Sequence, residues 1–216
     1  MTGCAIFTDR RAAGRQLADA LSDYNRQAPI VLALPRGGVP IAYEVATSLR
    51  APLELLIVRK IGAPGHMESG IGALVDGHPP ELILNPDVDK LGIDPEYIED
   101  QKVCKLTEIE RLRSLYFGNR RTRAVAGRNI ILVDDGIATG STARAALRGL
   151  KRMDAAHVTL AVPIAHSAAL DSLRLEWDDL VCLATPEPFH TVGIYYADGG
   201  QASDAEIVSL LRSAGH

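Results

Sequence analysis

The chain has 216 residues, of which 47% are hydrophobic and 23% are charged, and its formal net charge is −4 at pH 7. This composition is typical of a globular protein and excludes a disordered chain, a collagen-like repeat and a coiled coil. The acidic balance also argues against nucleic-acid binding over the whole surface, so any anion-binding site must be local.

The cysteine spacing and the N-terminal charges indicate a soluble, cytoplasmic protein. Its three cysteines lie far apart and form no Cys-x-x-Cys pair, which excludes the usual zinc motifs and fits a reducing compartment. Charged residues occupy positions 9–11, where a signal peptide would need an apolar stretch. The longest apolar runs have about eight residues, well short of the ~20 that span a bilayer, so we expect no membrane association.

Short β-type runs alternate with helix-type stretches along the chain, which predicts a parallel α/β sheet flanked by helices. In chain order, we expect a strand at residues 30–34, a helix at 38–49, a strand at 53–58, short strands at 73–75 and 81–84, a helix at 95–117, a strand at 129–133, a helix at 140–153, a strand at 158–162, a helix at 168–175, a strand at 180–183 and a helix at 204–212. No repeat and no linker interrupts this order, so a single domain over residues 1–216 is expected.

Two segments between the main strands have distinctive composition. Residues 61–72 contain four glycines and a proline, which predicts a mobile loop. Asp94 and Pro95 suit the N-cap and first position of a long helix, whose apolar stripe would pack against the rest of the protein.

Residues 130–142, Ile-Ile-Leu-Val-Asp-Asp-Gly-Ile-Ala-Thr-Gly-Ser-Thr, are the segment most informative about function. They predict a buried strand that ends in two carboxylates and a loop rich in glycine and hydroxyl groups that opens into a helix. Ligands of open α/β sheets bind beyond the carboxyl ends of strands, and loop amides at a helix N-terminus bind anions. Because the loop has no lysine, it suits a monophosphate better than a nucleoside triphosphate.

The adjacent carboxylates of Asp134 and Asp135 point to opposite sides of the strand, so they cannot easily share a proton. A bound phosphate would repel them unless hydroxyl donors lay between. Vicinal ribose hydroxyls meet that requirement.

A second candidate anion site is the segment Leu-Pro-Arg-Gly-Gly-Val at residues 34–39. Arg36 can bind phosphate oxygens in a bidentate way, and the amides of Gly37 and Gly38 face the same space. Arg59 and Lys60, which we place at the end of the next strand, add two cations at the same edge of the sheet, unless they are only a solvated strand end.

Residues 130–142 resemble the signature of the type I phosphoribosyltransferases, and residues 34–39 match the pyrophosphate loop of that family. The resemblance implies a Rossmann-like parallel sheet flanked by helices, with a mobile lid loop and a small hood formed by the terminal segments, residues 85–128 being a further candidate for the hood. More narrowly, the segments at 34–38, 58–65 and 183–193 look like those of a bacterial subgroup without an assigned acceptor.

The resemblance assigns the donor, 5-phosphoribosyl pyrophosphate (PRPP), to named residues. Asp134 and Asp135 would bind the ribose 2′- and 3′-hydroxyls and contact Mg²⁺ only indirectly, with PRPP oxygens. The residues implied for the 5′-phosphate are Gly136, Ala138, Thr139, Gly140, Ser141 and Thr142. Those implied for pyrophosphate are Arg36, Gly37, Gly38, Arg59 and Lys60, with a non-prolyl cis peptide between Pro35 and Arg36.

The implied activity is Mg²⁺-dependent displacement at C1 of PRPP by a nitrogenous, nucleobase-like acceptor with release of pyrophosphate, as in nucleotide metabolism. The expected catalytic residues are Asp134, Asp135, Arg36, Lys60 and Glu68, the last as a proton handler in the lid or a plain surface acid. A homodimer is expected from the family, with small-molecule substrates and without nucleic acid as a partner.

Two features of the sequence constrain the identity of the acceptor. Ala138 stands where 6-oxopurine enzymes of the family have an aspartate, which argues against hypoxanthine and guanine, and the predicted lid lacks the lysine of the orotate enzymes. Phe189 could stack an acceptor base or belong to the core.

A different class of function stays open, namely a regulator that senses PRPP or a nucleotide and kept only the fold. An RNA-binding regulator would want a basic face, and the arginines at 120, 121, 123 and 128 form either a solvated loop or a weak phosphate-attracting patch.

Overall fold

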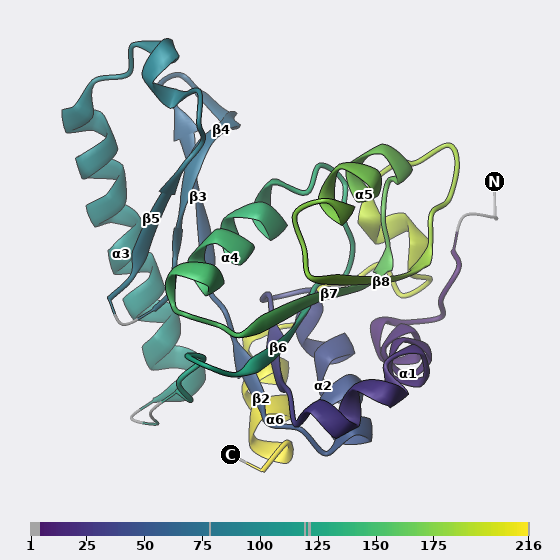
Figure 1. Ribbon diagram of the computed structural model, residues 1–216. Coiled ribbons are helices and arrows are strands. Elements are labelled where there is room, and N and C mark those ends of the chain that lie inside the picture. The colour runs from purple at the N-terminus through teal and green to yellow at the C-terminus, as the bar shows by residue number, and fades with distance from the viewer. Residues whose placement is uncertain (1–4, 78, 119, 121, 216) are drawn as a thin grey trace.

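The computed structural model describes residues 5–77, 79–118, 120 and 122–215, without the side chains of 66–69. Its main sheet has five strands in the order β2-β1-β6-β7-β8, and every neighbouring pair is parallel. The strands are β1 (Ile30–Ala33), β2 (Leu53–Leu55), β6 (Asn129–Val133), β7 (His157–Ile164) and β8 (Asp179–Ala184). The predicted parallel α/β sheet is therefore confirmed (Figure 1).

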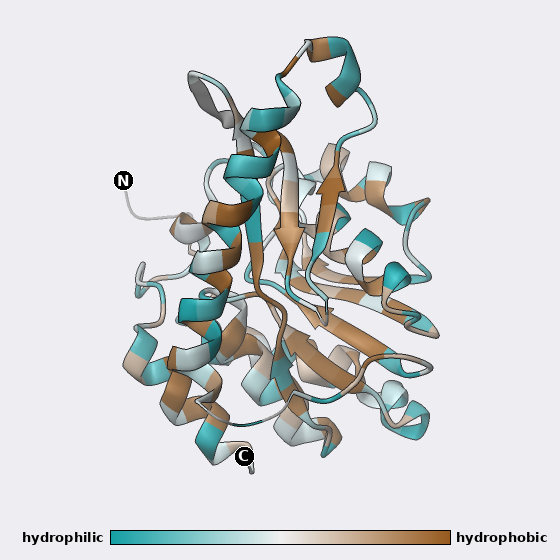
Figure 2. Ribbon diagram, turned by 90° about the vertical axis from the view of Figure 1, so that its left-hand side faces the viewer, coloured by the Kyte–Doolittle hydropathy of each residue, from teal (hydrophilic) through white to brown (hydrophobic). Residues whose placement is uncertain are grey.

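Helices cover both faces of this sheet because its strands are apolar on both sides. In β1, Val31 and Ala33 belong to one core cluster, whereas Ile30 and Leu32 belong to the other. The first cluster is closed by α1 (Arg10–Ala20), α2 (Gly38–Leu49) and α6 (Asp204–Ser213), and the second by α4 (Ser141–Arg152) and α5 (Ser167–Arg174). Figure 2 shows the hydrophobic strands enclosed by helices that carry hydrophilic residues on their outer faces.

A second, antiparallel sheet of three strands stands beside the first, and the long helix α3 (Pro95–Phe117) lies along it (Figure 1). Its strands are β3 (Val58–Ala63), β4 (His66–Val75) and β5 (Glu81–Leu84). The α3 start is as predicted, since the Asp94 carboxylate accepts a hydrogen bond from the Glu96 amide at 2.9 Å. Ile109, Leu112 and Tyr116 bury the apolar stripe of the helix.

Two predictions in this region are wrong. The single strand expected at 53–58 is divided into β2 and β3, which belong to different sheets, so Arg59 and Lys60 begin a strand rather than end one. The loop expected at 61–72 is instead the paired arms of the β3–β4 hairpin, with register shifts beside Gly62. The glycines there allow close strand contact: a Cβ atom at Gly72 would lie 2.5 Å from the carbonyl oxygen of Ile83.

The helix α1 was not predicted from the sequence, because its apolar residues are four alanines and a single leucine. Its N-cap is Asp9, whose carboxylate accepts from the Ala12 amide at 2.6 Å, and Leu17 packs in the core. Three short 3₁₀ helices, Ser22–Gln27, Val88–Leu91 and Val192–Tyr195, complete the described elements. Within the described ranges, none of the helices combines the length and apolar character that a bilayer crossing requires.

Candidate active site

The two segments singled out in the sequence, residues 34–39 and 130–142, both contribute residues to a single cavity. Ala33 of β1 pairs with Val133 of β6, so the segments that follow these residues leave the sheet side by side. The cavity between them has a volume of about 310 Å³. Its lining residues are Leu34, Pro35, Arg36, Gly37, Val58, Arg59, Lys60, Asp134, Asp135, Thr142 and Gln201. Both carboxylates and all three cations predicted for the donor site therefore border one space.

Part of the predicted set lies away from this lining. Of the residues implied for the 5′-phosphate, Thr142 lines the cavity, whereas Gly136, Ala138, Thr139, Gly140 and Ser141 do not. Gly38, implied for pyrophosphate, does not line it either. Phe189 packs against Tyr195 and His166, with ring centroids 5.5 and 5.4 Å away, and does not line the cavity. Glu68 falls in β4, and its side chain lies outside the described part of the structure.

Glycine is required in the first loop because two backbones meet there. A Cβ atom at Gly38 would lie 2.6 Å from the carbonyl oxygen of Val133, and one at Gly37 would overlap the carboxylate of Asp135. The peptide bond between Pro35 and Arg36 is cis, as the resemblance implied. The loop is therefore in van der Waals contact with the acidic pair.

Asp135 is paired with a residue that the sequence did not reveal. The buried guanidinium of Arg10 donates from Nε at 3.0 Å and from Nη2 at 2.6 Å to Oδ2 of Asp135. Arg10 also stacks over the ring of Tyr196 at 4.4 Å and donates to the carbonyl of Gly200. The Tyr196 hydroxyl donates to the carbonyl oxygen of Asp135 at 2.5 Å. The acid is thus held by two side chains from opposite ends of the chain.

The surroundings of Asp134 differ from those of Asp135. Removal from water raises the pKa of its carboxyl group well above the usual range, and the charge of Asp135 and a side-chain hydrogen bond with Asp135 raise it further. The Asp135 amide donates to Oδ1 of Asp134 at 2.9 Å, and this bond and the Lys60 ammonium act in the opposite direction. The expectation that the two carboxylates point to opposite sides of a strand is wrong, because β6 ends at Val133 and the two side chains interact. The two adjacent acids are therefore unlike: Asp135 is paired with an arginine, whereas the pKa of Asp134 is raised by burial and by its neighbour.

The three cations differ in how far they are already neutralised. Arg36 lies 3.4 Å from Asp204, and Arg59 lies 3.4 Å from Glu108 of α3. Lys60 is exposed and has no ion pair or hydrogen bond with another described residue. Lys60 is thus the cation most available to an anionic ligand.

The chemistry of the acidic pair fits Mg²⁺ only together with a ligand. No group of three His, Cys, Asp or Glu side chains that could hold a metal occurs among the described residues. Mg²⁺ is usually held by one or two carboxylates, water and substrate phosphates, and the cavity offers two carboxylates beside the cations expected to bind phosphate.

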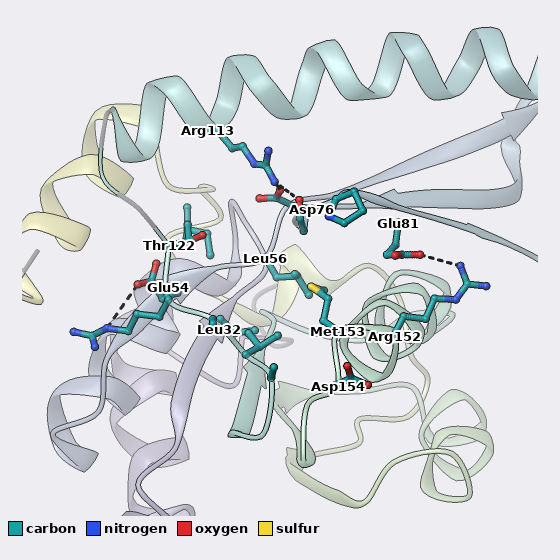
Figure 3. Close-up of a pocket in the computed structure, with 17 residues that line it drawn as sticks. Leu32, Glu54, Leu56, Asp76, Glu81, Arg113, Thr122, Arg152, Met153 and Asp154 are labelled. Carbon is teal, nitrogen blue, oxygen red and sulfur yellow. Dashed lines mark hydrogen bonds and ion pairs between the residues drawn. The ribbon is translucent and has the colours of Figure 1, made fainter.

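A larger cavity of about 390 Å³ lies between β2, the second sheet and the end of α4, away from the loops described above (Figure 3). Three carboxylates that line it are paired within the protein: Glu54 with Arg120 at 2.8 and 2.6 Å, Asp76 with Arg113, and Glu81 with Arg152 at 3.1 Å. Asp154 lines the cavity as well. Arg120 therefore serves the fold, which neither interpretation of the arginine cluster anticipated. Arg121 of that cluster lies outside the described residues.

Comparisons with known proteins agree with this geometry. Two curated sequences from Mycobacterium tuberculosis, strains CDC 1551 / Oshkosh and H37Rv, are each 41% identical over 210 residues, and their names give a phosphoribosyl transferase assignment as provisional. The alignment covers 97% of this chain and 47% of each relative, so the chain spans about half the length of the curated relatives it matches.

Solved structures share the fold. The crystal structure of TT1426 from Thermus thermophilus has a TM-score of 0.82 at 38% identity and covers 97% of this chain and 99% of that one. A hypothetical protein from Neisseria gonorrhoeae, solved with bound ppGpp, has a TM-score of 0.54 at 13% identity over 99% of this chain and 98% of that one, which shows a similar fold alone. The family model described as "Phosphoribosyl transferase domain" matches residues 6–190. The acidic pair and the loop at residues 34–37 border one cavity, and the chain belongs to the phosphoribosyl transferase domain family.

Proposed function

We propose that this protein transfers the 5-phosphoribosyl group of PRPP to a nitrogenous acceptor and releases pyrophosphate. The observation that carries the proposal is the shared cavity, in which the carboxylates of Asp134 and Asp135 face the cations Arg36, Arg59 and Lys60. A ligand with vicinal hydroxyls at its centre and phosphates at both ends suits this charge arrangement. PRPP is such a ligand.

The proposed binding mode follows the arrangement of the elements. The ribose hydroxyls would lie on Asp134 and Asp135, and the 5′-phosphate on the loop 136–142, where α4 begins. The pyrophosphate would lie on Arg36, the amides of Gly37 and Gly38, and Lys60 of β3. Each end of the donor would thus meet a separate anion-binding loop.

In the proposed reaction, the bond between C1 and the pyrophosphate oxygen breaks while a bond from C1 to the acceptor nitrogen forms with inversion. Bound Mg²⁺ would supply charge neutralisation to the leaving pyrophosphate. The residues of this chain would position the donor and stabilise the negative charge that moves onto the leaving group. Arg36, Arg59 and Lys60 are placed for the second task, because all three line the cavity.

Ala138, in the loop before α4, narrows the class of acceptor. Ala138 provides no carboxylate beside the acceptor, so we propose an acceptor other than a 6-oxopurine. Phe189 is proposed as an acceptor contact only if the acceptor extends beyond the cavity toward Tyr195. Glu68, a homodimeric state and a role in nucleotide metabolism likewise stay predictions.

Acceptor-dependent pyrophosphate release tests the proposal. The full chain is incubated with Mg²⁺, PRPP and a panel that includes adenine, orotate, hypoxanthine, guanine and non-base amines. Release that depends on one acceptor is the expected result, and the double variant Asp134→Asn, Asp135→Asn should bind no PRPP. Asp171→Asn, which alters an exposed acid on α5, is the matched control. If the double variant still binds PRPP, the ribose assignment is wrong.

A second candidate function is a PRPP- or nucleotide-sensing regulator with little catalytic activity. The pairing of Asp135 with Arg10 favours it, because a carboxylate already paired with a guanidinium has less charge to offer Mg²⁺ bound with PRPP during transfer. Tight PRPP binding without turnover against the whole panel would support the sensor over the enzyme.

A further inference from the structure

A second cationic cavity lies directly beside the proposed donor site. Its volume is about 220 Å³, and it lies between the first turns of α4 and the second sheet. The polar residues that line it are Lys60, Asn85, Ser141, Arg144 and Arg148. We propose that this cavity binds a phosphoryl group, either inorganic phosphate or a small phosphate ester, and that the anion bound there lowers the affinity of the donor site.

The charge of the lining is entirely positive. Lys60, Arg144 and Arg148 contribute three cations, and no aspartate or glutamate is among the described residues that line the space. Like charges gathered around one small space repel one another, and an anion between them relieves that repulsion. This cavity differs in this respect from the larger one, which is lined by Glu54, Asp76, Glu81 and Asp154 as well as by arginines.

Arg144, Arg148 and Arg152 of α4 differ in whether they already have a partner within the protein. Arg144 donates from Nε to Glu176 at 2.6 Å and from Nη2 to Ser172 at 2.6 Å, and Arg152 pairs with Glu81 at 3.1 Å. Arg148 lies between them on the same helix face, at the i, i+4 spacing, and has no ion pair or hydrogen bond with a described residue. A half-buried arginine without an internal acid is well suited to bind an external anion.

The opposite wall of the cavity supplies room and a second free cation. A Cβ atom at Gly70 would meet nothing within 4 Å, and the Asn85 amide donates to the Gly70 carbonyl at 2.7 Å, which fixes that wall. Side chains alternate along β3, so Arg59 points to Glu108 of α3 and Lys60 points to the other face, toward α4. Lys60 therefore lines both cavities.

Lys60 lines both cavities, and Ser141 of this cavity belongs to the loop proposed for the 5′-phosphate, so the two ligands would influence each other. A phosphate held by Arg148 would also attract the Lys60 ammonium, which the proposed donor site needs for pyrophosphate. By thermodynamic linkage, the two ligands would weaken each other's binding by the same factor. The phosphate site itself does not depend on the proposed function, whereas its effect on PRPP does.

Phosphate binding to the full chain, measured by calorimetry without Mg²⁺ or PRPP, tests the site. Two classes of phosphate binding are expected, one in the donor cavity and a second class in the cavity lined by Arg148. Arg36→Gln removes a cation of the donor cavity and should leave the second class in place. Arg148→Gln should weaken that class by about tenfold or more, since a charge-assisted hydrogen bond is lost. Arg212→Gln, on an exposed part of α6, is the charge-matched control and should bind as the unmodified chain does. Glycerol 3-phosphate in place of inorganic phosphate distinguishes an ester from the free ion.

Two further variants guard against a folding artefact. Arg148→Lys keeps the charge and should retain binding to within about threefold of the unmodified affinity, because the cation still reaches the anion. Asn85→Asp brings a carboxylate to the cavity wall and should abolish the same class of binding. If Arg148→Gln and Asn85→Asp both bind phosphate as the unmodified chain does, the site does not exist. Phosphate binding is measured without turnover, so the phosphate site can be confirmed even if no pyrophosphate is released from PRPP. Equally, pyrophosphate release can be observed even if the phosphate site does not exist.

Discussion

The side chain of Arg10 joins the N-terminal helix to the acidic end of β6 and to the segment around Tyr196. It is almost fully buried, at 4% exposure, and Asp135 is 14% exposed. A buried ion pair is costly to break from one side because the remaining charge loses its partner. Arg10 therefore sets the orientation of Asp135 as well as its charge environment.

Replacing Arg10 tests this arrangement. Arg10→Gln should lower the free energy of unfolding by about 3 kcal/mol and weaken PRPP binding, because Asp135 would no longer be held. Arg10→Lys should restore part of both. Denaturant unfolding and PRPP titration give the two readouts. Arg15→Gln, a substitution at an exposed arginine 3.5 Å from Glu44, should change stability by less than about 1 kcal/mol. Equal effects of the two glutamine variants would contradict this account.

The raised pKa of Asp134 predicts how stability depends on pH. The folded state holds the proton more tightly than the unfolded chain does, so ionising Asp134 destabilises the fold as pH rises from the usual aspartate range through the raised value. Asp134→Asn removes that cost and keeps the acceptor for the Asp135 amide. The variant should be more stable than the unmodified chain at pH 7, with a gain that shrinks toward pH 4.

Thermal unfolding across that pH range is the measurement. Asp171→Asn, at a position 79% exposed, should show no such trend. A gain for Asp134→Asn that is constant with pH, or grows as pH falls, would show that ionisation of Asp134 carries no cost.

At the scale of elements, the contact between the first loop and β6 depends on glycine. The start of α2 lies against the end of β6, and neither Gly37 nor Gly38 has room for a Cβ atom. Gly37 has φ −62°, a helical value that any residue adopts, so the space alone excludes a side chain. The elements approach closely enough for one cavity to take residues from both.

Gly37→Ala should displace the Asp135 carboxylate, cost about 1–3 kcal/mol of stability through overpacking and weaken PRPP binding. Gly193→Ala is the matched control, because a Cβ atom there would meet nothing within 4 Å. Calorimetric PRPP titration of both variants, with unfolding curves, distinguishes a local clash from a general loss of structure. Unchanged PRPP affinity in Gly37→Ala would show that the position of Asp135 is not critical.

At the scale of the whole molecule, the main sheet is joined to the chain beyond α3 by a buried ion pair. Glu54 of β2 is 1% exposed, and Arg120, which follows α3, donates two hydrogen bonds to it. Tyr116 adds a second link, donating to Asp204 of α6 at 2.7 Å, and burial and the Asp204 carboxylate raise its pKa to about 12. These contacts connect α3 to the main sheet and to the C-terminal helix.

Arg120→Gln should leave the Glu54 carboxylate buried with a weaker partner, since Arg123 lies 3.9 Å away, and should cost about 3 kcal/mol. Adding Glu54→Gln should recover part of that loss, because the buried charge is removed. Denaturant midpoints of the single and double variants measure both, and Arg212→Gln should stay within about 0.5 kcal/mol of the unmodified chain. If the double variant were less stable than Arg120→Gln alone, the buried charge of Glu54 would not be the cause of the stability loss.

The sequence was sufficient for features that depend on neighbouring residues. The five parallel strands, the Asp94 cap of α3 and the two glycine-containing loops follow from periodicity and motif spacing within about fifteen residues. That Asp134 and Arg36 lie at one sheet edge also followed, because parallel strands present their carboxyl ends together.

Only the tertiary structure determined what depends on distant contacts. Arg10 and Asp135 are separated by 125 positions, and no local pattern marks a polar helix as the source of a buried arginine. Residues 61–72 contain the glycines of a loop, yet they form strands because the two arms of the β3–β4 hairpin pair with each other and Ile61 and Ile71 pack against α3. The two directions taken by Arg59 and Lys60 likewise follow from which elements pack on each face of the second sheet. Hydrogen bonding and burial with remote segments outweighed the local preferences at these positions.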